Sequence, residues 1–251
     1  MRWLLPVLLA TSAAACAPDD VDFAGKHCPC GPGWVCQAAS NTCQRPAEGP
    51  ECRALFVVQP TVESADDLVA ARIEEAHDCA VTTVADDMVQ VGDADEHDVI
   101  LISSSSRSSE VGGLFRGTVL PVVSWEPFVF PDLGMTDVTA STHFGAAEMV
   151  TDIEIIGPSH PLAAGMNGTA TIYTEPSFAT WGVPAGEGGH VATVDGHPTL
   201  LFFRAGDRTV AERATGCRIG LPMHDLSAER FTDAGWAMFD AAFTWALDGC
   251  P

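Results

Sequence analysis

A glutamate and a histidine, each placed just after an apolar run, are the side chains of this sequence best suited to acid–base chemistry. Glu126 lies in "LPVVSWEPFVF", between a tryptophan and a proline, and His224 lies in "LPMHDL" after "CRIGLP". A carboxylate and an imidazole act together as a base and its orienting partner, or hold each other as a structural ion pair. Both roles stay open, so Glu126 and His224 are the candidate catalytic residues.

Two serines and a tryptophan are candidates for contact with a ligand. Ser103 and Ser104 open the serine run that closes "DVILI", and their hydroxyl and backbone N–H groups either bind polar atoms of a ligand or cap the next helix. Trp125, next to Glu126, either stacks on a sugar or ring or packs within the wall of the site.

The spacing of the histidines and acids gives no support to a metal site. No two of His143, Glu175 and His224 are four residues apart, the spacing that would place them on one face of a helix. The sequence therefore predicts no metal and no other cofactor.

The first half of the main segment alternates apolar strands with a helix. "ALFVVQ" (54–59), "AVTTVA" (80–85), "DVILIS" (98–103) and "LPVVSW" (120–125) are the expected strands, and "SADDLVAARIEEA" (64–76) has helical spacing of its apolar residues. Strands that are apolar on both faces are typical of a parallel sheet covered by helices. We therefore predict an α/β fold with a flavodoxin-like, mostly parallel sheet and helices on both faces.

The second half is more mixed. "MVTDIEII" (149–156) reads as one strand, "HVATVDGHPTLLFF" (190–203) as a hairpin with Asp195-Gly196 at its turn, and "CRIGLP" (217–222) as a further strand. The segment 227–247 is the expected final helix. Its aromatic and apolar side chains at three-to-four spacing are expected to pack on the sheet; they are Phe231, Trp236, Phe239, Phe243 and Leu247.

The charge of the chain excludes one class of partner. The chain has 251 residues and a formal net charge of −22, from 34 acidic residues against 12 basic ones. Such a chain repels nucleic acid and carries no basic stripe for binding it. No nucleic-acid partner is expected.

The N-terminus reads as an export signal. A positive start, an apolar run and the small residues 13–15 predict a signal peptide over 1–15, too short to span a membrane. "SAAAC" followed by "APDD" resembles a bacterial lipoprotein signal, in which Cys16 becomes the lipidated first residue. Ala13 stands where such signals usually have leucine, so ordinary cleavage after Ala15 is the competing interpretation. The expected location is the cell envelope, with the membrane as a partner through a lipid anchor.

Eight further cysteines form an even set, as an oxidising compartment favours. Four of them crowd into residues 28–43, between a tether (16–27) and a linker (44–52), and predict a small disulfide knot, with a metal site on these thiols and His27 as the rival interpretation. Cys52 and Cys79 begin strands that are neighbours in a flavodoxin-like sheet and are therefore expected to pair. By elimination Cys217 pairs with Cys250. The cysteines assigned to the knot are Cys28, Cys30, Cys36 and Cys43.

Two parts of the chain resemble known families. The knot is loosely similar to the Dickkopf-like cysteine-rich modules near the start of bacterial surface lipoproteins. Residues 53–250, the expected α/β domain, resemble the ThuA-like branch of the class I glutamine amidotransferase-like superfamily. The resemblance rests on four segments: "DVILISSSS", "LPVVSWEP", "SHPLAAGMNGTATIYTEP" and "CRIGLPMHDLSAERFTDAGWAMFDAAFTWAL".

This resemblance implies roles for particular residues. Amidotransferase relatives carry a nucleophilic cysteine in the turn after the strand that matches "LPVVS", where this chain has Trp125 and Glu126, and no G-x-C-x-G or G-x-S-x-G occurs in the sequence. Glu126 is then expected at the mouth of the site, half-solvated. His224 aligns with the histidine that the family has at the last strand end, and Glu175 in "YTEP" matches a frequent acid and is a candidate ligand-binding residue.

Two functions remain open at this point. The missing nucleophile favours a non-catalytic module that binds a small polar ligand or glycan. The alternative is a carbohydrate-related hydrolase or isomerase that uses Glu126 and His224, which the link of ThuA-like relatives with sugar utilisation favours.

The lipid anchor yields the first testable prediction. Cys16→Ser removes the only atom to which the lipid would be attached, so the variant is expected to lose the partition into a detergent phase that the parent shows. Phase partition of the two proteins, expressed in a bacterium that processes lipoproteins, checks this. A variant that partitions like the parent would show that Cys16 carries no lipid.

Overall fold

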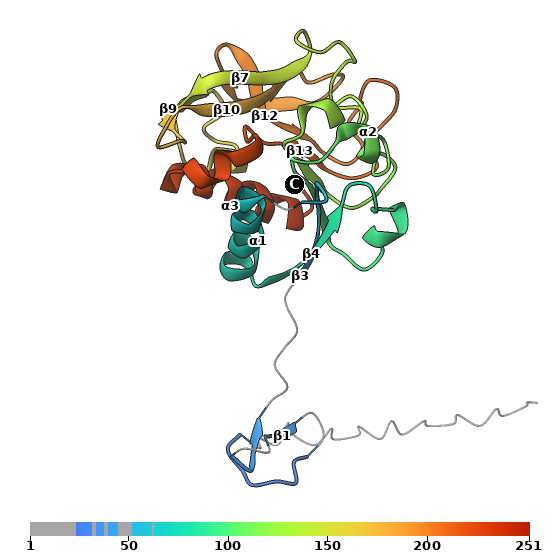
Figure 1. Cartoon of the computed structure of the whole chain (residues 1–251), viewed down its shortest axis with the longest axis vertical. Coiled ribbons are helices and arrows are strands. Elements are labelled where there is room, and N and C mark those ends of the chain that lie inside the picture. Colours follow the sequence, from blue (N-terminus) through green and yellow to red (C-terminus); the bar gives the residue numbers. More distant parts are fainter. Residues whose placement is uncertain (1–23, 32–33, 38–39, 45–51, 62) are drawn as a thin grey trace, which may run out of the picture. The chain divides into compact units, whose positions relative to one another are not determined.

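The structure, a computed structural model, describes residues 24–31, 34–37, 40–44, 52–61 and 63–251 (Figure 1). The chain divides into two units, residues 1–49 and 50–251. The expected signal peptide, Cys16, and most of the tether and linker lie outside the described residues. Among the described residues, none of the helices has both the length and the apolar character that a bilayer span requires.

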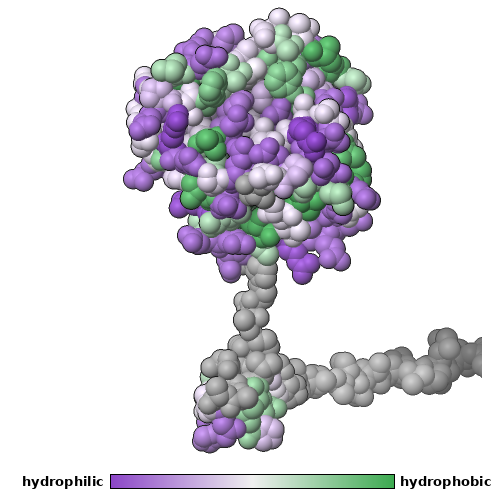
Figure 2. All heavy atoms as spheres, in the orientation of Figure 1, coloured by the Kyte–Doolittle hydropathy of each residue, from purple (hydrophilic) through white to green (hydrophobic). Residues whose placement is uncertain are grey.

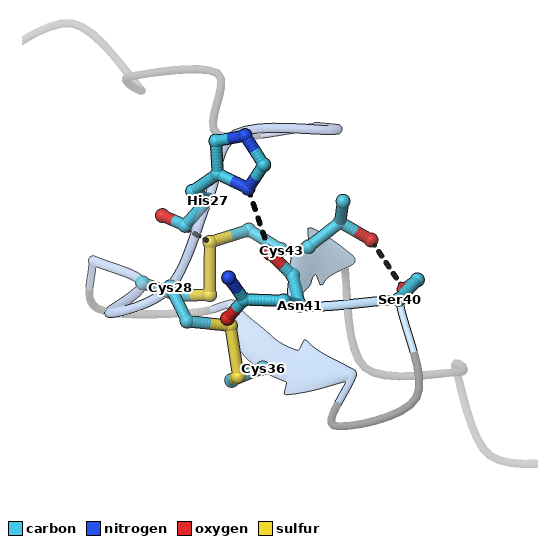
Figure 3. The surroundings of a disulfide bond; sticks show 8 residues. His27, Cys28, Cys36, Ser40, Asn41 and Cys43 are labelled. Atoms are coloured by element: carbon cyan, nitrogen blue, oxygen red, sulfur yellow. Dashed lines mark hydrogen bonds between the residues drawn. A yellow bond between two sulfur atoms is a disulfide. The ribbon is translucent and has the colours of Figure 1, made fainter.

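The N-terminal unit is a two-stranded ribbon held by two disulfides. Strands β1 (Val35–Gln37) and β2 (Thr42–Gln44) pair antiparallel. The bonds Cys28–Cys36 and Cys30–Cys43 staple the ribbon, and the His27 ring lies 3.2 Å from the carbonyl oxygen of Asn41 (Figure 3). The predicted disulfide knot is confirmed. These four sulfur atoms are bonded to one another, which removes the alternative of a thiolate metal site.

The second unit is built on a nine-stranded sheet in the order β4-β3-β5-β6-β13-β12-β11-β8-β9. The first five strands pair in parallel, and the remaining pairs are antiparallel, so that only β12 and β8 run against the other strands. The predicted α/β fold with a mostly parallel sheet is confirmed. The strands are β3 (Cys52–Val58), β4 (Cys79–Ala85), β5 (Val99–Ile102), β6 (Val122–Ser124), β8 (Asp152–Ile155), β9 (Gly168–Thr171), β11 (Gly189–Val194), β12 (His197–Phe203) and β13 (Arg218–Gly220).

The two faces of the sheet are covered differently. Helices α1 (Ser64–His77) and α3 (Asp233–Leu247) bury their apolar sides on one face (Figure 1). The opposite face is covered by short turns: η1 (Val91–Ala94), α2 (Ser108–Val111) and η2 (Pro127–Val129). The segments that lead to these turns are rich in acids or in glycine and serine, and they lack the apolar stripe that a long helix needs to pack.

A second antiparallel ribbon lies over β12. Strands β7 (Phe144–Val150) and β10 (Ser177–Gly182) pair with each other, and the Thr199 hydroxyl donates to the carbonyl oxygen of Thr180 at 2.7 Å (Figure 1). The expectation of one strand through "MVTDIEII" is wrong. Strand β7 ends at Val150 and β8 begins at Asp152 in another sheet, while Met149, with a φ of +58°, lies within β7 where its register with β10 shifts.

The final helix begins later than the sequence pattern predicted. Residues Asp225–Arg230 form the separate turn η4, and α3 starts at Asp233 because the Thr232 hydroxyl accepts a hydrogen bond from the backbone N–H of Gly235 at 3.2 Å. Phe239 and Phe243 lie in the core as expected. Leu247 is 36% exposed, although its neighbours Trp245 and Ala246 are buried in the core. A further turn, η3 (Pro161–Ala163), packs on α3.

The surface of the second unit is mixed. On the face seen in Figure 2, hydrophilic side chains predominate and apolar ones are scattered among them.

The two remaining disulfides are those that the sequence predicted. Cys52 and Cys79 are partners in the parallel register of β3 and β4, with Cα atoms 4.6 Å apart. Cys217 and Cys250 join the start of β13 to the end of the chain beyond α3, with Cα atoms 6.2 Å apart.

Removal of the Cys217–Cys250 bond should weaken the fold markedly. The bond joins cysteines 33 residues apart in the sequence. Without this cross-link the unfolded chain gains conformational entropy, which lowers the free energy of unfolding by about 3–4 kcal/mol. The double variant Cys217→Ala, Cys250→Ala is expected to melt roughly ten degrees lower than the parent. A reductant breaks the bond in the parent and should therefore reduce the difference in melting temperature between the parent and the double variant. Equal melting of the two oxidised proteins, or a mass-mapped cross-link between Cys217 and the knot, would contradict this assignment.

Candidate functional site

The candidate site lies where three neighbouring parallel strands end. Strand β6 pairs with β5 on one side and β13 on the other, and Ser124 stands level with Ile102 and Gly220. The residues that follow these three strands therefore leave the sheet at the same edge. They are the serine run 103–106, Glu126 and, after three further residues, His224. The carboxyl edge of a parallel sheet is where ligands bind in open α/β folds.

Glu126 caps the turn that follows β6. Its carboxylate oxygen Oε1 accepts a hydrogen bond from the backbone N–H of Phe128 at 3.0 Å, and its own N–H donates to the Ser124 hydroxyl at 3.2 Å. The proline at 127 favours this tight turn. Glu126 is only 6% exposed, so the expectation of a half-solvated carboxylate is wrong. The cap holds the side chain against the protein.

The surroundings of Glu126 change its acidity. Burial raises the pKa of this carboxyl from 4.5 to about 7; the N–H of Phe128 and the nearby His224 oppose the rise, and Asp225 adds to it. A carboxyl with a pKa near 7 can both take up and release a proton at neutral pH. Glu126 thus has the property that acid–base chemistry requires.

His224 and Asp225 begin the turn η4 beside Glu126. The Nδ1 atom of His224 lies 3.2 Å from a carboxylate oxygen of Asp225, and the His224 ring packs against Phe178, with ring centroids 5.5 Å apart. His224 and Glu126 interact electrostatically, but no hydrogen bond joins their side chains. The structure therefore brings the two predicted residues to one place without a direct contact.

Asp225 is a member of the site that the sequence reasoning missed. Its φ of +29° is unusual for a residue with a side chain, and its N–H donates to the Ser104 hydroxyl, which holds this conformation. Burial alone would raise the pKa of Asp225, but its close contact with the His224 ring, followed by its interaction with Ser104, outweighs burial and lowers the pKa. Asp225 is therefore an anion at neutral pH. Its place directly after His224 in "MHDL" was the available signal.

The serine run is tied to a buried acid on α1. The hydroxyls of Ser103 and Ser105 donate to the two carboxylate oxygens of Asp66, at 2.6 and 2.7 Å. Ser103 is fully buried, so its predicted contact with a ligand is corrected to a structural role. Burial raises the pKa of Asp66. Ser104 remains near the site through its bond to Asp225.

Two other predicted ligand-binding residues lie elsewhere. Trp125 is 1% exposed and packs between Phe56 and Phe239, with ring centroids 5.7 and 6.5 Å away. Its predicted contact with a ligand is therefore wrong, because the side chain points into the core under α3. Glu175 is exposed in the segment between β9 and β10 and does not line the cavity described next.

A cavity of about 280 Å³ opens beside His224. Glu126 does not line it, but it interacts with His224 and Asp225, which do. A larger hollow of about 650 Å³ lies at the opposite edge of the sheet, around Cys52, His77 and Asp98, away from these groups. The cavity beside His224 is lined by Glu63, Ser177, Phe178, His224, Asp225, Leu226 and Arg230.

No metal cluster gathers at this edge in the part of the chain that the structure describes. His143, Glu175 and His224 do not come together, and the three cysteines close enough to share an ion, Cys28, Cys30 and Cys43, are bonded in disulfides.

The raised pKa of Glu126 predicts a pH-dependent stability. The unfolded chain releases this proton near pH 4.5, whereas the folded protein holds it up to about pH 7. The free energy of unfolding therefore falls as the pH rises from 4.5 to 7, by an amount on the order of 3 kcal/mol. Glu126→Gln keeps an acceptor for the N–H of Phe128 and has no proton to lose. The variant is therefore expected to melt several degrees above the parent at pH 8 and to lose this advantage toward pH 5.

Glu148→Gln is the matched control, since Glu148 is an exposed glutamate on β7. Its melting difference from the parent should stay small across the same pH range. A pH-independent difference for Glu126→Gln would show that Glu126 titrates normally.

Comparisons with known proteins bear on the fold. A scan of the sequence against protein-family models gives no match, and a search of curated proteins gives none either. Among solved structures, the chain is similar to a ThuA-like protein from Bacteroides uniformis, with a TM-score of 0.52 and 11% identity over 81% of this chain and 94% of that one. It is also similar to the cytoplasmic protein STM3548 from Salmonella typhimurium, with a TM-score of 0.51 and 10% identity over 78% of this chain and 98% of that one.

At such low identity the structural similarity is evidence for the fold alone. It confirms the fold that the resemblance in the sequence implies. Over about four fifths of its length, this chain has the fold of a ThuA-like protein.

Proposed function

We propose that this chain is an exported, lipid-anchored protein of a bacterial cell envelope, and that its α/β domain binds a small polar ligand, a sugar or glycan, in the cavity beside His224 at the carboxyl edge of the sheet. The observation that carries the binding site is the cavity of about 280 Å³ beside His224, at the edge where this class of fold binds ligands. Its volume is close to the lower end of the range for small-molecule sites.

The lining of the cavity suits a sugar. Phe178 and Leu226 are 46% and 44% exposed, although each is large and apolar, and together they offer a surface for the C–H face of a ring. His224, Asp225 and Arg230 offer polar atoms for hydroxyl groups. The carbohydrate class also follows from the ThuA-like resemblance.

Binding without catalysis is supported by the lack of a nucleophile. The turn after β6, where amidotransferase relatives carry their cysteine, has Trp125 in the core and Glu126 as a cap. All cysteines in the described part of the chain are in disulfides. Thioester chemistry therefore has no sulfur to use in this part of the chain.

Export is supported by the cysteines as well as by the leader. Four disulfides in the described residues are expected of a chain that folds in an oxidising compartment. The apolar run and the small residues before Cys16 supply the corresponding signal.

A second candidate function rests on one observation. Glu126, with its pKa of about 7, is suited to proton transfer, and His224 and Asp225 lie beside it. This favours a carbohydrate-related hydrolase or isomerase in which Glu126 and His224 exchange protons with the substrate. The burial of Glu126 behind the residues that line the cavity counts against direct contact with a substrate.

A thermal-shift screen over sugars and short glycans tests the binding function. A ligand at about 100 times its dissociation constant stabilises the folded protein by about 2.7 kcal/mol, enough for a shift of several degrees. Phe178→Ala removes the apolar surface and should abolish the shift. Val138→Ala, a truncation at a residue that is 79% exposed and outside the cavity, should keep it.

Turnover of a hit separates the two candidates. Binding alone predicts that the parent leaves the ligand unchanged after long incubation, as judged by chromatography. Product formation that Glu126→Gln abolishes, while the thermal shift persists, would make the protein an enzyme. A shift that survives Phe178→Ala would place the ligand outside this cavity.

A further inference from the structure

The cavity beside His224 carries more acid than base. Two carboxylates, those of Glu63 and Asp225, belong to residues that line it, against one guanidinium, that of Arg230. The Nη1 atom of Arg230 donates to the carbonyl oxygen of Pro176, which directs this cation to the protein backbone. The guanidinium keeps its charge in this bond, and the two carboxylates exceed it by one negative charge.

No lysine or arginine in the described part of the chain forms an ion pair with either carboxylate, and the cationic partner available to Asp225 is the His224 ring at 3.2 Å. Glu63 accepts a hydrogen bond from the side-chain amide of Gln59 at 2.7 Å on Oε1, and no described residue donates to its Oε2 atom. Asp225 is 52% exposed on its side chain and remains ionised, because hydrogen bonds lower its pKa. Both groups thus keep capacity to bind a donor from outside the protein.

An aromatic side chain completes the cavity. Phe178 is 46% exposed where most aromatic side chains of this unit are buried, and its ring lies against that of His224. The face of an aromatic ring attracts cations as well as apolar surface. An aromatic ring beside carboxylates is a usual setting for recognition of a ligand ammonium group.

We infer that the cavity selects a sugar-sized ligand with a protonated amine, whose ammonium group is held by Asp225 and Glu63 and whose apolar face lies on Phe178. This inference rests on the proposed binding function and names the class of ligand: an amino sugar rather than a neutral or acidic one. A neutral sugar has no positive group to pair with the carboxylates of Asp225 and Glu63, and an acidic sugar is repelled by them.

Three sugars that have the same six-membered ring but differ in charge test the inference: glucosamine, glucose and glucuronate. Dissociation constants are measured by calorimetry at about pH 6.5, where a sugar amine is protonated and Asp225 is ionised. Glucosamine is expected to bind roughly tenfold more tightly than glucose, and glucuronate more weakly than glucose.

Charge-neutral variants locate the amine. Asp225→Asn and Glu63→Gln keep size and hydrogen-bonding shape, and asparagine tolerates the positive φ of position 225. Each is expected to weaken glucosamine binding roughly fivefold and glucose binding by less, so that the preference for the amine falls. Glu148→Gln, which removes one exposed negative charge outside the cavity, should leave both affinities unchanged.

The outcomes separate this inference from the function on which it rests. Equal binding of glucosamine and glucose, both lost in Phe178→Ala, would overturn the amine preference and keep the cavity as a sugar site. An amine preference that Glu148→Gln reduces as much as Asp225→Asn would also overturn it, since the preference would then come from the overall charge. Failure of all three sugars to bind the parent would overturn both.

Discussion

The burial of the Glu126 carboxylate at the end of β6 is the interaction on which the rest of the site depends. The capping bond from Phe128 fixes the turn, and the turn directs Trp125 into the core on one side and leaves Glu126 behind His224 and Asp225 on the other. A buried carboxylate with one hydrogen bond is costly when ionised, and this cost raises its pKa toward neutrality. A small change in the turn would move both the core and the site.

The parallel half of the sheet supplies the frame for this arrangement. Three adjacent strands, β5, β6 and β13, end at one edge, and polar residues follow each of them: the serine run, Glu126 and, after three apolar residues, His224. These turns are linked to α1 and η4 through Asp66, the serine run and Asp225. The network links residues far apart in the sequence: the buried Asp66 holds the serine run, and Ser104 of that run holds Asp225, which lines the cavity.

Much of the fold could be predicted from the sequence, because side chains that are buried in strands and helices recur there as apolar runs or at regular spacing. The strands β3, β5 and β6, the hairpin of β11 and β12, and the pairing Cys52–Cys79 follow from apolar runs, an Asp-Gly turn and strand order. The start of α3 could not be predicted, since it depends on the cap at Thr232. The site was predicted at Glu126 and His224, but the exposure of Glu126, the inward direction of Trp125 and the contribution of Phe178 depend on tertiary packing, which single-sequence patterns do not contain.

The protonation state of the Glu126 carboxyl group is the central claim about the site, and it can be measured. A titration of glutamate carboxyl carbons by nuclear magnetic resonance, with the Glu126 signal assigned by its absence in Glu126→Gln, measures it directly in the folded protein. We predict that the Glu126 carboxyl titrates near pH 7. A midpoint near 4.5 would show that Glu126 is solvated, and would contradict both its burial at the end of β6 and its part in the site.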